Sequence, residues 1–217
     1  MPADPAVEPW PVRTLAKIQY SENYLLSDID GDGVLDIVAG MWWLQNMGDG
    51  TFIPHRITEE NIDIAQCGVA DINGDGWPDI LISDATAEVI EGKPMPRLMW
   101  FENPGGRAGE PWKRHVIDLL RWPHSLAVAD LDGDGKLEII CGEHDPAQSF
   151  RNQCRLFLYK PANPAGTAWK RFILDERFEH HCGARLLDTG CGRAIVSHGW
   201  GEGRYLHIWE PQIIEES

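Results

Sequence analysis

Several features are missing from this 217-residue chain, and each absence removes a class of protein. No apolar run approaches the roughly 18 residues that a membrane-spanning helix requires. The first residues, MPADPAVEPW, have neither the basic start nor the apolar stretch of a secretory signal peptide. No basic patch offsets the net charge of −15. We therefore expect no membrane span and no nucleic-acid partner.

Zinc knuckles and the common nucleotide or hydrolase motifs are also missing. The five cysteines (Cys67, Cys141, Cys154, Cys182 and Cys191) include no C-x-x-C pair, and their odd number leaves at least one thiol free unless two chains are joined. We expect buried free cysteines in strands, which favours a reducing compartment. No Ser-His-Asp order, P-loop or dinucleotide fingerprint occurs.

Acidic residues are abundant and concentrated in three similar strings. These are DIDGDGVLDIV from Asp28, DINGDGWPDIL from Asp71 and DLDGDGKLEII from Asp130. The strings hold 11 of the 34 acidic residues, and without those carboxylates the balance would be 23 acidic against 19 basic residues. Like charges so close together repel each other, so the strings indicate a bound cation more than an acidic surface.

The spacing of each string suits a hard cation. In D-x-D-x-D-x-x-x-D the side chains at positions 1, 3, 5 and 9 and the carbonyl of position 7 can converge, and glycines at 4 and 6 permit a tight wrap. Oxygen ligands in a flexible loop favour calcium over magnesium. The expected ligands are Asp28, Asp30, Asp32, Val34 and Asp36; Asp71, Asn73, Asp75, Trp77 and Asp79; and Asp130, Asp132, Asp134, Lys136 and Glu138.

An EF-hand shares the start of this motif but requires a glutamate at position 12 and flanking helices. Position 12 is Ala39, Ile82 and Cys141 in the three strings, and the residues around it have the composition of strands. The sequence therefore excludes the EF-hand.

The strings belong to a longer repeat of four short strands. The third copy gives SLAVAD, KLEIICG, RLFLYK and WKRFIL, and no window has a useful helical period. Four strands in each repeat of about 40 to 60 residues is typical of a β-propeller blade. We predict an all-β propeller in a single domain over residues 1–217, with blades at about 19–58, 62–118, 123–175 and 179–211.

The last repeat has only three strands. Residues 9–16, in EPWPVRTLAK, resemble the fourth strand PWKRHVID of the second repeat, so we expect them to complete the last blade and close the ring. Part of a larger propeller, or two chains forming an eight-blade ring, would produce the same complementary ends.

D-x-D-G-D-G-x-x-D followed by an apolar strand resembles the FG-GAP/VCBS repeat family of integrin-like propellers, over about residues 9–211. The resemblance implies that each loop joins the innermost strand of a blade to the second strand and binds calcium, so three calcium ions are expected. It also implies an extracellular or periplasmic protein, whereas the cysteines and the missing signal favour the cytoplasm. The fourth copy, from Asp188, lacks the carboxylates, and Arg193 stands in place of a cation.

Functional residues of a propeller usually lie at the end opposite such structural loops. The strand order places His124, His144, His181, His198, Glu143 and Arg121 there as candidate catalytic residues. It also places there, as candidate ligand-binding residues, Tyr24, Trp42, Trp43, Gln66, Trp122 and Trp200. We expect the four histidines to share one pocket with Glu143 and Arg121 at its rim.

Three interpretations of this end remain open. The residues cap the core, or they bind a sugar through tryptophan stacking, or they perform acid–base chemistry of lyase or dehydratase type on a sugar or uronate. The histidines could also hold a transition metal. The expected partner is a small molecule or glycan; the alternative is a protein–protein interaction or adhesion platform without catalysis.

Overall fold

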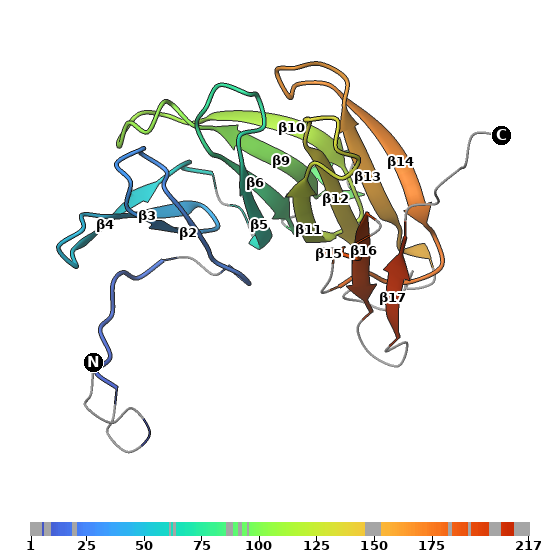
Figure 1. Ribbon diagram of the computed structural model, residues 1–217, viewed down its shortest axis with the longest axis horizontal. Helices are drawn as coiled ribbons and strands as arrows, with labels where there is room; N and C mark the ends of the chain where they lie inside the picture. The colour runs from blue at the N-terminus through green and yellow to red at the C-terminus, as the bar shows by residue number, and fades with distance from the viewer. Residues whose placement is uncertain are drawn as a thin grey trace.

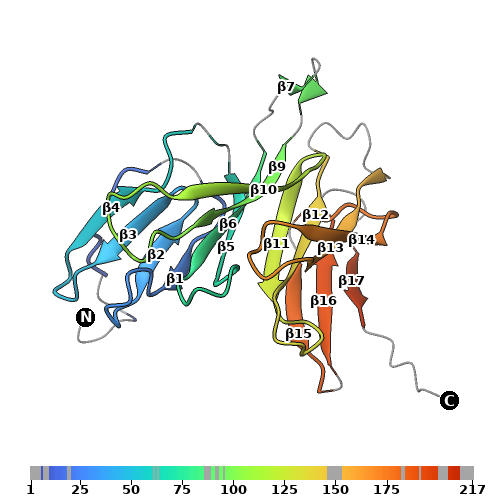
Figure 2. The same cartoon turned by 90° about the horizontal axis from the view of Figure 1, so that it is seen from above.

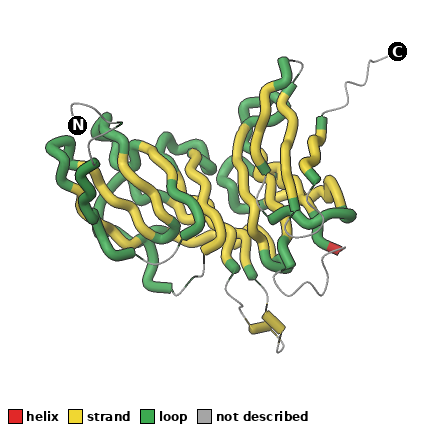
Figure 3. Tube along the Cα trace, turned by 90° about the horizontal axis from the view of Figure 1, so that it is seen from below, coloured by secondary structure: helices red, strands yellow, loops and turns green. Residues whose placement is uncertain are grey.

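The computed structural model describes residues 6, 10–18, 21–60, 62, 64–85, 89–90, 93–94, 96–145, 153–181, 184–190, 192–199 and 205–210. Strands and loops account for nearly all of these residues, and no α-helix occurs among them (Figure 3). The prediction of an all-β chain is confirmed.

The strands form four antiparallel sheets, in each of which the strands pair in chain order. Sheet 1 contains β1 (Leu25–Ser27), β2 (Asp36–Ala39), β3 (Trp42–Asn46) and β4 (Phe52–Arg56). Sheet 2 contains β5 (Ile64–Ala70), β6 (Asp79–Asp84), β9 (Arg97–Glu102) and β10 (Lys113–Leu119). Sheet 3 contains β11 (Pro123–Ala129), β12 (Glu138–Glu143), β13 (Leu156–Pro161) and β14 (Trp169–Asp175). Sheet 4 contains β15 (Arg185–Asp188), β16 (Arg193–His198) and β17 (Leu206–Trp209).

The four sheets follow one another across the molecule. The first strands of consecutive sheets are in contact, since β1 touches β5, β5 touches β11, and β11 touches β15. Figures 1 and 2 show sheet 1 on one side of the molecule and sheet 4 on the other. A small hairpin of β7 (Val89–Ile90) and β8 (Lys93–Pro94) projects from sheet 2 (Figure 2).

One apolar cluster fills each of the three interfaces between sheets. Between sheets 1 and 2, Val38 and Trp43 pack with Ile80 and Phe101. The next cluster joins sheets 2 and 3, and the third joins sheets 3 and 4. Because side chains alternate along a strand, Ile80 and Ile82 face sheet 1 while Leu81 faces sheet 3. Sheets 2 and 3, which each lie between two other sheets, therefore bury both of their faces.

The expected closing strand at residues 9–16 is not formed over its described residues, 10–16, so that prediction is wrong for this structure. Residues 10–18 belong to no strand, and sheet 4 has three strands in the part of the chain that is described. Arg13 instead donates a 2.5 Å hydrogen bond to the Gly50 carbonyl, and its guanidinium lies over the Phe52 ring in sheet 1. The beginning of the chain thus contacts the nearest sheet, because sheet 4 lies on the far side of the molecule (Figure 1).

Three of the cysteines are buried free thiols, as expected: Cys67, Cys141 and Cys154. Burial raises the pKa of the Cys154 thiol to about 12, so this group is protonated and inert at neutral pH. Cys182 and Cys191 lie outside the described residues.

Candidate functional site

The three acidic strings form the loops between the first and second strands of sheets 1, 2 and 3. Within each loop the carboxylate at position 1 accepts a hydrogen bond from the backbone N–H of position 6, and the carboxylate at position 5 accepts one from position 7. The position-1 bonds are Gly33 to Asp28 at 2.9 Å, Gly76 to Asp71 at 2.9 Å and Gly135 to Asp130 at 3.0 Å. The position-5 bonds are Val34 to Asp32 at 2.7 Å, Trp77 to Asp75 at 2.9 Å and Lys136 to Asp134 at 2.9 Å. Three copies of the sequence thus adopt one loop geometry.

Position 9 differs from the other acidic positions because its carboxylate is buried. Asp36 is fully buried and accepts hydrogen bonds from the N–H groups of Ile29 and Asn46 and from Nε1 of Trp43. Asp79 repeats the two backbone bonds with Ile72 and Asn103. Burial raises the pKa of Asp79 to about 7. The position-9 aspartates therefore tie the loop to the third strand of the same sheet.

The carboxylates converge differently in the first and third loops. One ligand atom each from Asp28, Asp30 and Asp32 lies within 4.8 Å of the others, and so does one each from Asp130, Asp132 and Glu138. Glu138 joins its group where Asp36 does not, because its side chain is one methylene longer. In the second loop Asn73 replaces an aspartate and donates a 3.0 Å hydrogen bond to Asp75. The first and third loops therefore gather carboxylate oxygens of the kind that a hard cation prefers, with different donor sets.

A basic side chain already faces the third loop. Lys160 on β13 forms an ion pair with Asp132, and its ammonium lies 3.8 Å from a Glu138 oxygen. Gln45 occupies the position in sheet 1 that Lys160 occupies in sheet 3, and it donates a 2.5 Å hydrogen bond to Asp30. The third loop therefore carries a cationic neighbour where the first has a neutral amide.

The fourth, eroded loop contains Asp188, whose carboxylate accepts a hydrogen bond from the Gly190 N–H. The guanidinium of Arg193 does not fold into this loop. It donates a 2.6 Å hydrogen bond to the Asp130 carbonyl, so it contacts the third loop instead.

At the opposite end of the sheets, three histidines from three segments lie together. His124 is the second residue of β11, His144 follows β12, and His181 precedes β15. The ring centroids of His124 and His181 are 4.1 Å apart, those of His144 and His181 are 4.2 Å apart, and those of His124 and His144 are 5.2 Å apart. We call these three residues the histidine cluster.

A glycine allows this close approach. A Cβ on Gly142 would lie 2.4 Å from both the Cβ of His180 and the Oγ of Ser125. The absence of a side chain at Gly142 therefore lets the segment before β15 pack directly on β12. His180 is fully buried in this contact, which places its neighbour His181 beside His144.

Carboxylates and a carbonyl hold the rings in place. Nδ1 of His144 is paired with the buried carboxylate of Glu179, whose oxygen also accepts from the Asp145 N–H. Because a carboxylate can only accept, this pairing favours the neutral tautomer of His144 that has its proton on Nδ1 and a lone pair on Nε2. In His124, Nδ1 lies 2.6 Å from the His181 carbonyl and Nε2 lies 3.2 Å from Glu22.

The surroundings keep part of the cluster neutral. Burial, together with the neighbouring His124 and His144, lowers the pKa of His181 to about 3. Burial also lowers the pKa of His144, although Glu179 opposes this shift. Neutral imidazoles at pH 7 can accept a proton or a hydrogen bond, as a general base must.

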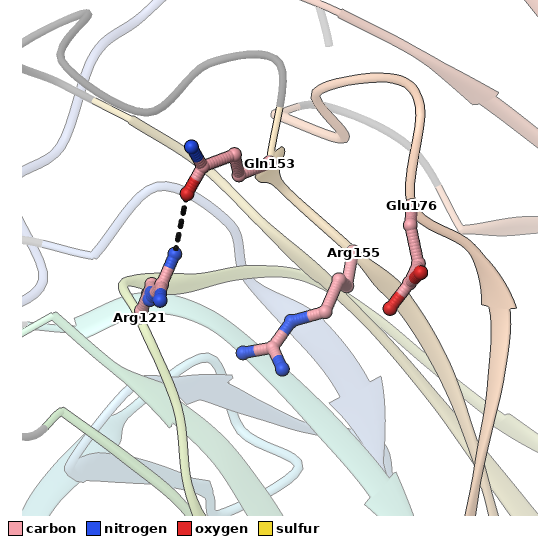
Figure 4. Close-up of a pocket in the computed structure, with 4 residues that line it drawn as sticks. All are labelled: Arg121, Gln153, Arg155 and Glu176. Atoms are coloured by element: carbon pink, nitrogen blue, oxygen red, sulfur yellow. Dashed lines mark hydrogen bonds between the residues drawn. The ribbon is translucent and has the colours of Figure 1, made fainter.

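The remaining candidate catalytic residues do not belong to the cluster. His198 is exposed and pairs with the Gly199 carbonyl, although its charge also lowers the pKa of His181. Glu143 is buried in a two-pronged ion pair with Arg155, so its carboxylate serves as an anchor. Arg121 lines a cavity of about 290 Å³ with Gln153, Arg155 and Glu176. Figure 4 shows the Arg121 guanidinium turned toward Gln153, 3.4 Å away.

The candidate ligand-binding residues separate into exposed and buried groups. Tyr24 is 74% exposed, and Trp122 is half-buried with a left-handed φ of 47°, a strained conformation for a bulky residue. Trp43 is 1% exposed and donates its indole N–H to Asp36, and Gln66 is also buried. The prediction that Trp43 offers a stacking surface is therefore wrong, because its ring belongs to the core. Trp42 is half-buried against the same cluster, and Trp200 lies outside the described residues.

Two carboxylates of this site were missed by the sequence reasoning. Glu22 precedes β1 and Glu179 precedes β15, so both lie in segments without a repeated motif. The string FEHH, residues 178–181, places Glu179 two residues from His181 and is a signal that could have indicated it.

The expectation of a transition metal at the histidines gains no support from the geometry. The groups of three potential ligand residues whose atoms lie within 4.8 Å of one another, in the described part of the chain, are the two acidic ones. The imidazole nitrogens therefore do not converge as the loop carboxylates do. The described residues also contain no helix long and apolar enough to cross a membrane.

Comparison with known proteins identifies the repeat. No curated protein matched the chain significantly. The model of the FG-GAP-like repeat matches residues 28–82 and 84–141, which together are just over half of the chain. These segments contain the three acidic loops and most of sheets 1 and 2. The chain belongs to the FG-GAP-like repeat family.

Proposed function

We propose that the protein is a calcium-stabilised β-propeller whose histidine cluster acts on a carbohydrate, by lyase-type proton abstraction next to a uronate carboxylate. The observation that carries the proposal is the pair formed by His144 and Glu179. A buried carboxylate holds one imidazole nitrogen, so the other nitrogen is presented as a base of fixed tautomer. His181, which burial keeps neutral, supplies a polar ring beside it.

Each neighbouring group has a role in such a reaction. Nε2 of His144 would take the proton from the carbon next to the carboxylate, after which the bond to the leaving oxygen breaks. His124, which faces Glu22, is the candidate group to return a proton to that oxygen. Arg121, exposed at the cavity beside Glu143, is suited to pair with the substrate carboxylate.

Calcium belongs to the structural part of this proposal. The first and third loops each gather three carboxylate oxygens, which suits a hard cation. Calcium in these loops would offset the repulsion between the carboxylates and hold each first strand to its second. It lies at the end of the sheets opposite the histidines, so it supplies stability and takes no part in proton transfer.

A panel of uronate-containing polysaccharides tests the proposal. We expect at least one polymer to yield an unsaturated product, seen as new ultraviolet absorbance, and to lose this on His144→Asn. His115→Asn is the matched control, because His115 also pairs with a glutamate, Glu102, at 2.7 Å but lies on β10 away from the cluster. Binding of a polymer without product would leave a carbohydrate-binding module, and no binding to any polymer would reject the carbohydrate.

A protein-interaction platform is the second candidate function. Exposed apolar side chains on the outermost sheets favour it, including Leu26 at 61% and Leu206 at 73%. A pull-down with the acidic loops loaded and unloaded with calcium would test it independently of any sugar.

A further inference from the structure

In the described part of the chain, the two outermost sheets have apolar faces that no other sheet covers. On sheet 1, Leu26, Ile37, Leu44 and Pro54 are direct cross-strand neighbours and therefore lie in one row on one face. On sheet 4, Leu187, Ala194, Val196 and Ile208 share the corresponding outer face. Leu26 is 61% exposed, Leu187 is 47% exposed and Ile208 is 50% exposed, whereas Leu44 and Ala194 are buried within the same faces.

These two faces are the two halves of an interface that already occurs three times in the chain. Ile37 occupies the same position in sheet 1 as Ile80 in sheet 2 and Ile139 in sheet 3. Ile80 and Ile139 both face the preceding sheet. On sheet 4 the residues facing the preceding sheet are Ile195, Leu186 and Trp209, so Val196 and Ile208 face the position of a following sheet. Sheet 1 thus lacks a predecessor and sheet 4 lacks a successor.

One chain does not bring the two faces together, since sheets 1 and 4 lie on opposite sides of the molecule (Figures 1 and 2). We propose that two copies of this chain close a ring of eight sheets, in which sheet 4 of each copy packs on sheet 1 of the other. Such head-to-tail contacts form a ring when the rotation closes, and eight sheets is within the usual range of propellers, whereas three copies would exceed it.

The beginning of the chain supplies a further argument for a second copy. Residues 10–16, WPVRTLA, resemble the starts of WKRHVID and WKRFILD, which form the fourth strands β10 and β14. In this structure they form no strand, and Val12 is 94% exposed. Sheet 4 has three described strands and ends at β17. The N-terminal segment of one copy can therefore pair with β17 of the other, at the same junction.

The mass of the full-length chain in solution, by light scattering over a range of concentrations, tests this proposal. We expect twice the 24.4 kDa mass of one chain. Ile208→Glu and Leu26→Lys should each raise the dimer dissociation constant by roughly 100-fold, because each variant places a charge in both junctions of the ring. Ile173→Glu is the control, since Ile173 is 46% exposed on β14 of sheet 3, outside the outer faces.

Mixing the two variants sharpens the test. Only a head-to-tail ring leaves one junction intact and places Lys beside Glu in the other, so the mixture should recover a dimer. A monomeric wild-type chain, an open polymer, or a dimer that survives both substitutions would overturn the proposal. This surface is separate from the histidine cluster, so any of these results would leave the proposed chemistry standing.

Discussion

The two ends of the sheets differ in whether their residues are repeated from sheet to sheet. At the acidic end, three loops repeat the same carboxylates and the same backbone hydrogen bonds. At the histidine end, the residues that meet come from unlike segments, and Glu179 and Glu22 have no counterpart in the repeat. The acidic loops recur because sheets 1, 2 and 3 each contain one. The histidine cluster occurs once and is formed by residues that are not repeated between sheets. This difference supports our proposal that the acidic end stabilises the fold and that the histidine end binds the ligand.

The largest effect expected from this difference between the two ends is on catalysis. If turnover of a uronate polymer is found, His144→Ala should reduce its rate by about 10²- to 10⁴-fold, because a general base is lost. Glu179→Gln should also slow the reaction by disturbing the tautomer of His144, with a shifted pH profile. The melting temperature of both variants in calcium should change little. A rate that neither variant affects would remove His144 from the mechanism.

Calcium removal should lower stability through the loops of the acidic end. Each loop that binds calcium only in the folded state should add about 2.7 kcal/mol at a calcium concentration 100 times its dissociation constant. We expect a chelator to lower the melting temperature, and added calcium, but not added magnesium, to restore it. Identical melting curves with chelator and with calcium would show that the loops are not ion sites.

Within one loop, buried and exposed carboxylates should differ. In calcium-free buffer Asp36→Ala should cost about 3 kcal/mol, because it leaves the N–H groups of Ile29, Asn46 and Trp43 without an acceptor. Asp32→Ala, at an exposed position, should cost under about 1 kcal/mol. Urea denaturation of both variants measures the difference, and equal losses would contradict the structural role of position 9.

Stability should also depend on pH through the histidine end. Burial lowers the pKa of His180 to about 4 and that of His181 to about 3, so the folded state binds fewer protons than the unfolded state below their ordinary value of 6.5. The contribution of these two histidines to the free energy of unfolding should therefore fall as the pH drops from 6.5 toward 4. His181→Asn should flatten this slope in urea titrations at several pH values, and an unchanged slope would place His181 in solvent.

The smallest effect concerns Lys160. Lys160→Met removes the ammonium beside Asp132 and Glu138, so the third loop should bind calcium several-fold more tightly. Gln45→Met at the equivalent position of sheet 1 is the matched control and removes only a neutral hydrogen bond. Calorimetric titration of both variants would distinguish them, and equal changes would mean that the charge of Lys160 does not matter.

Much of the fold was predictable because it repeats. The four-strand units, the loops between first and second strands and the buried cysteines all followed from local pattern. Trp43 was misjudged because its position near the end of the second strand suggested that it faces the ligand, whereas its indole bonds to Asp36 inside the core. The closing strand was misjudged because sequence similarity cannot show which sheet a segment can reach.

The sequence by itself determined the strands, the acidic loops and their donor atoms, because these depend on residues within about ten positions of one another. Only the tertiary structure decided which carboxylates converge, that Lys160 faces the third loop and that His124, His144 and His181 meet. Those contacts join residues from different strands and sheets, and their distances depend on how the sheets pack. Gly142 illustrates the reason, since the space left by its missing side chain sets the approach of the segment that carries His181.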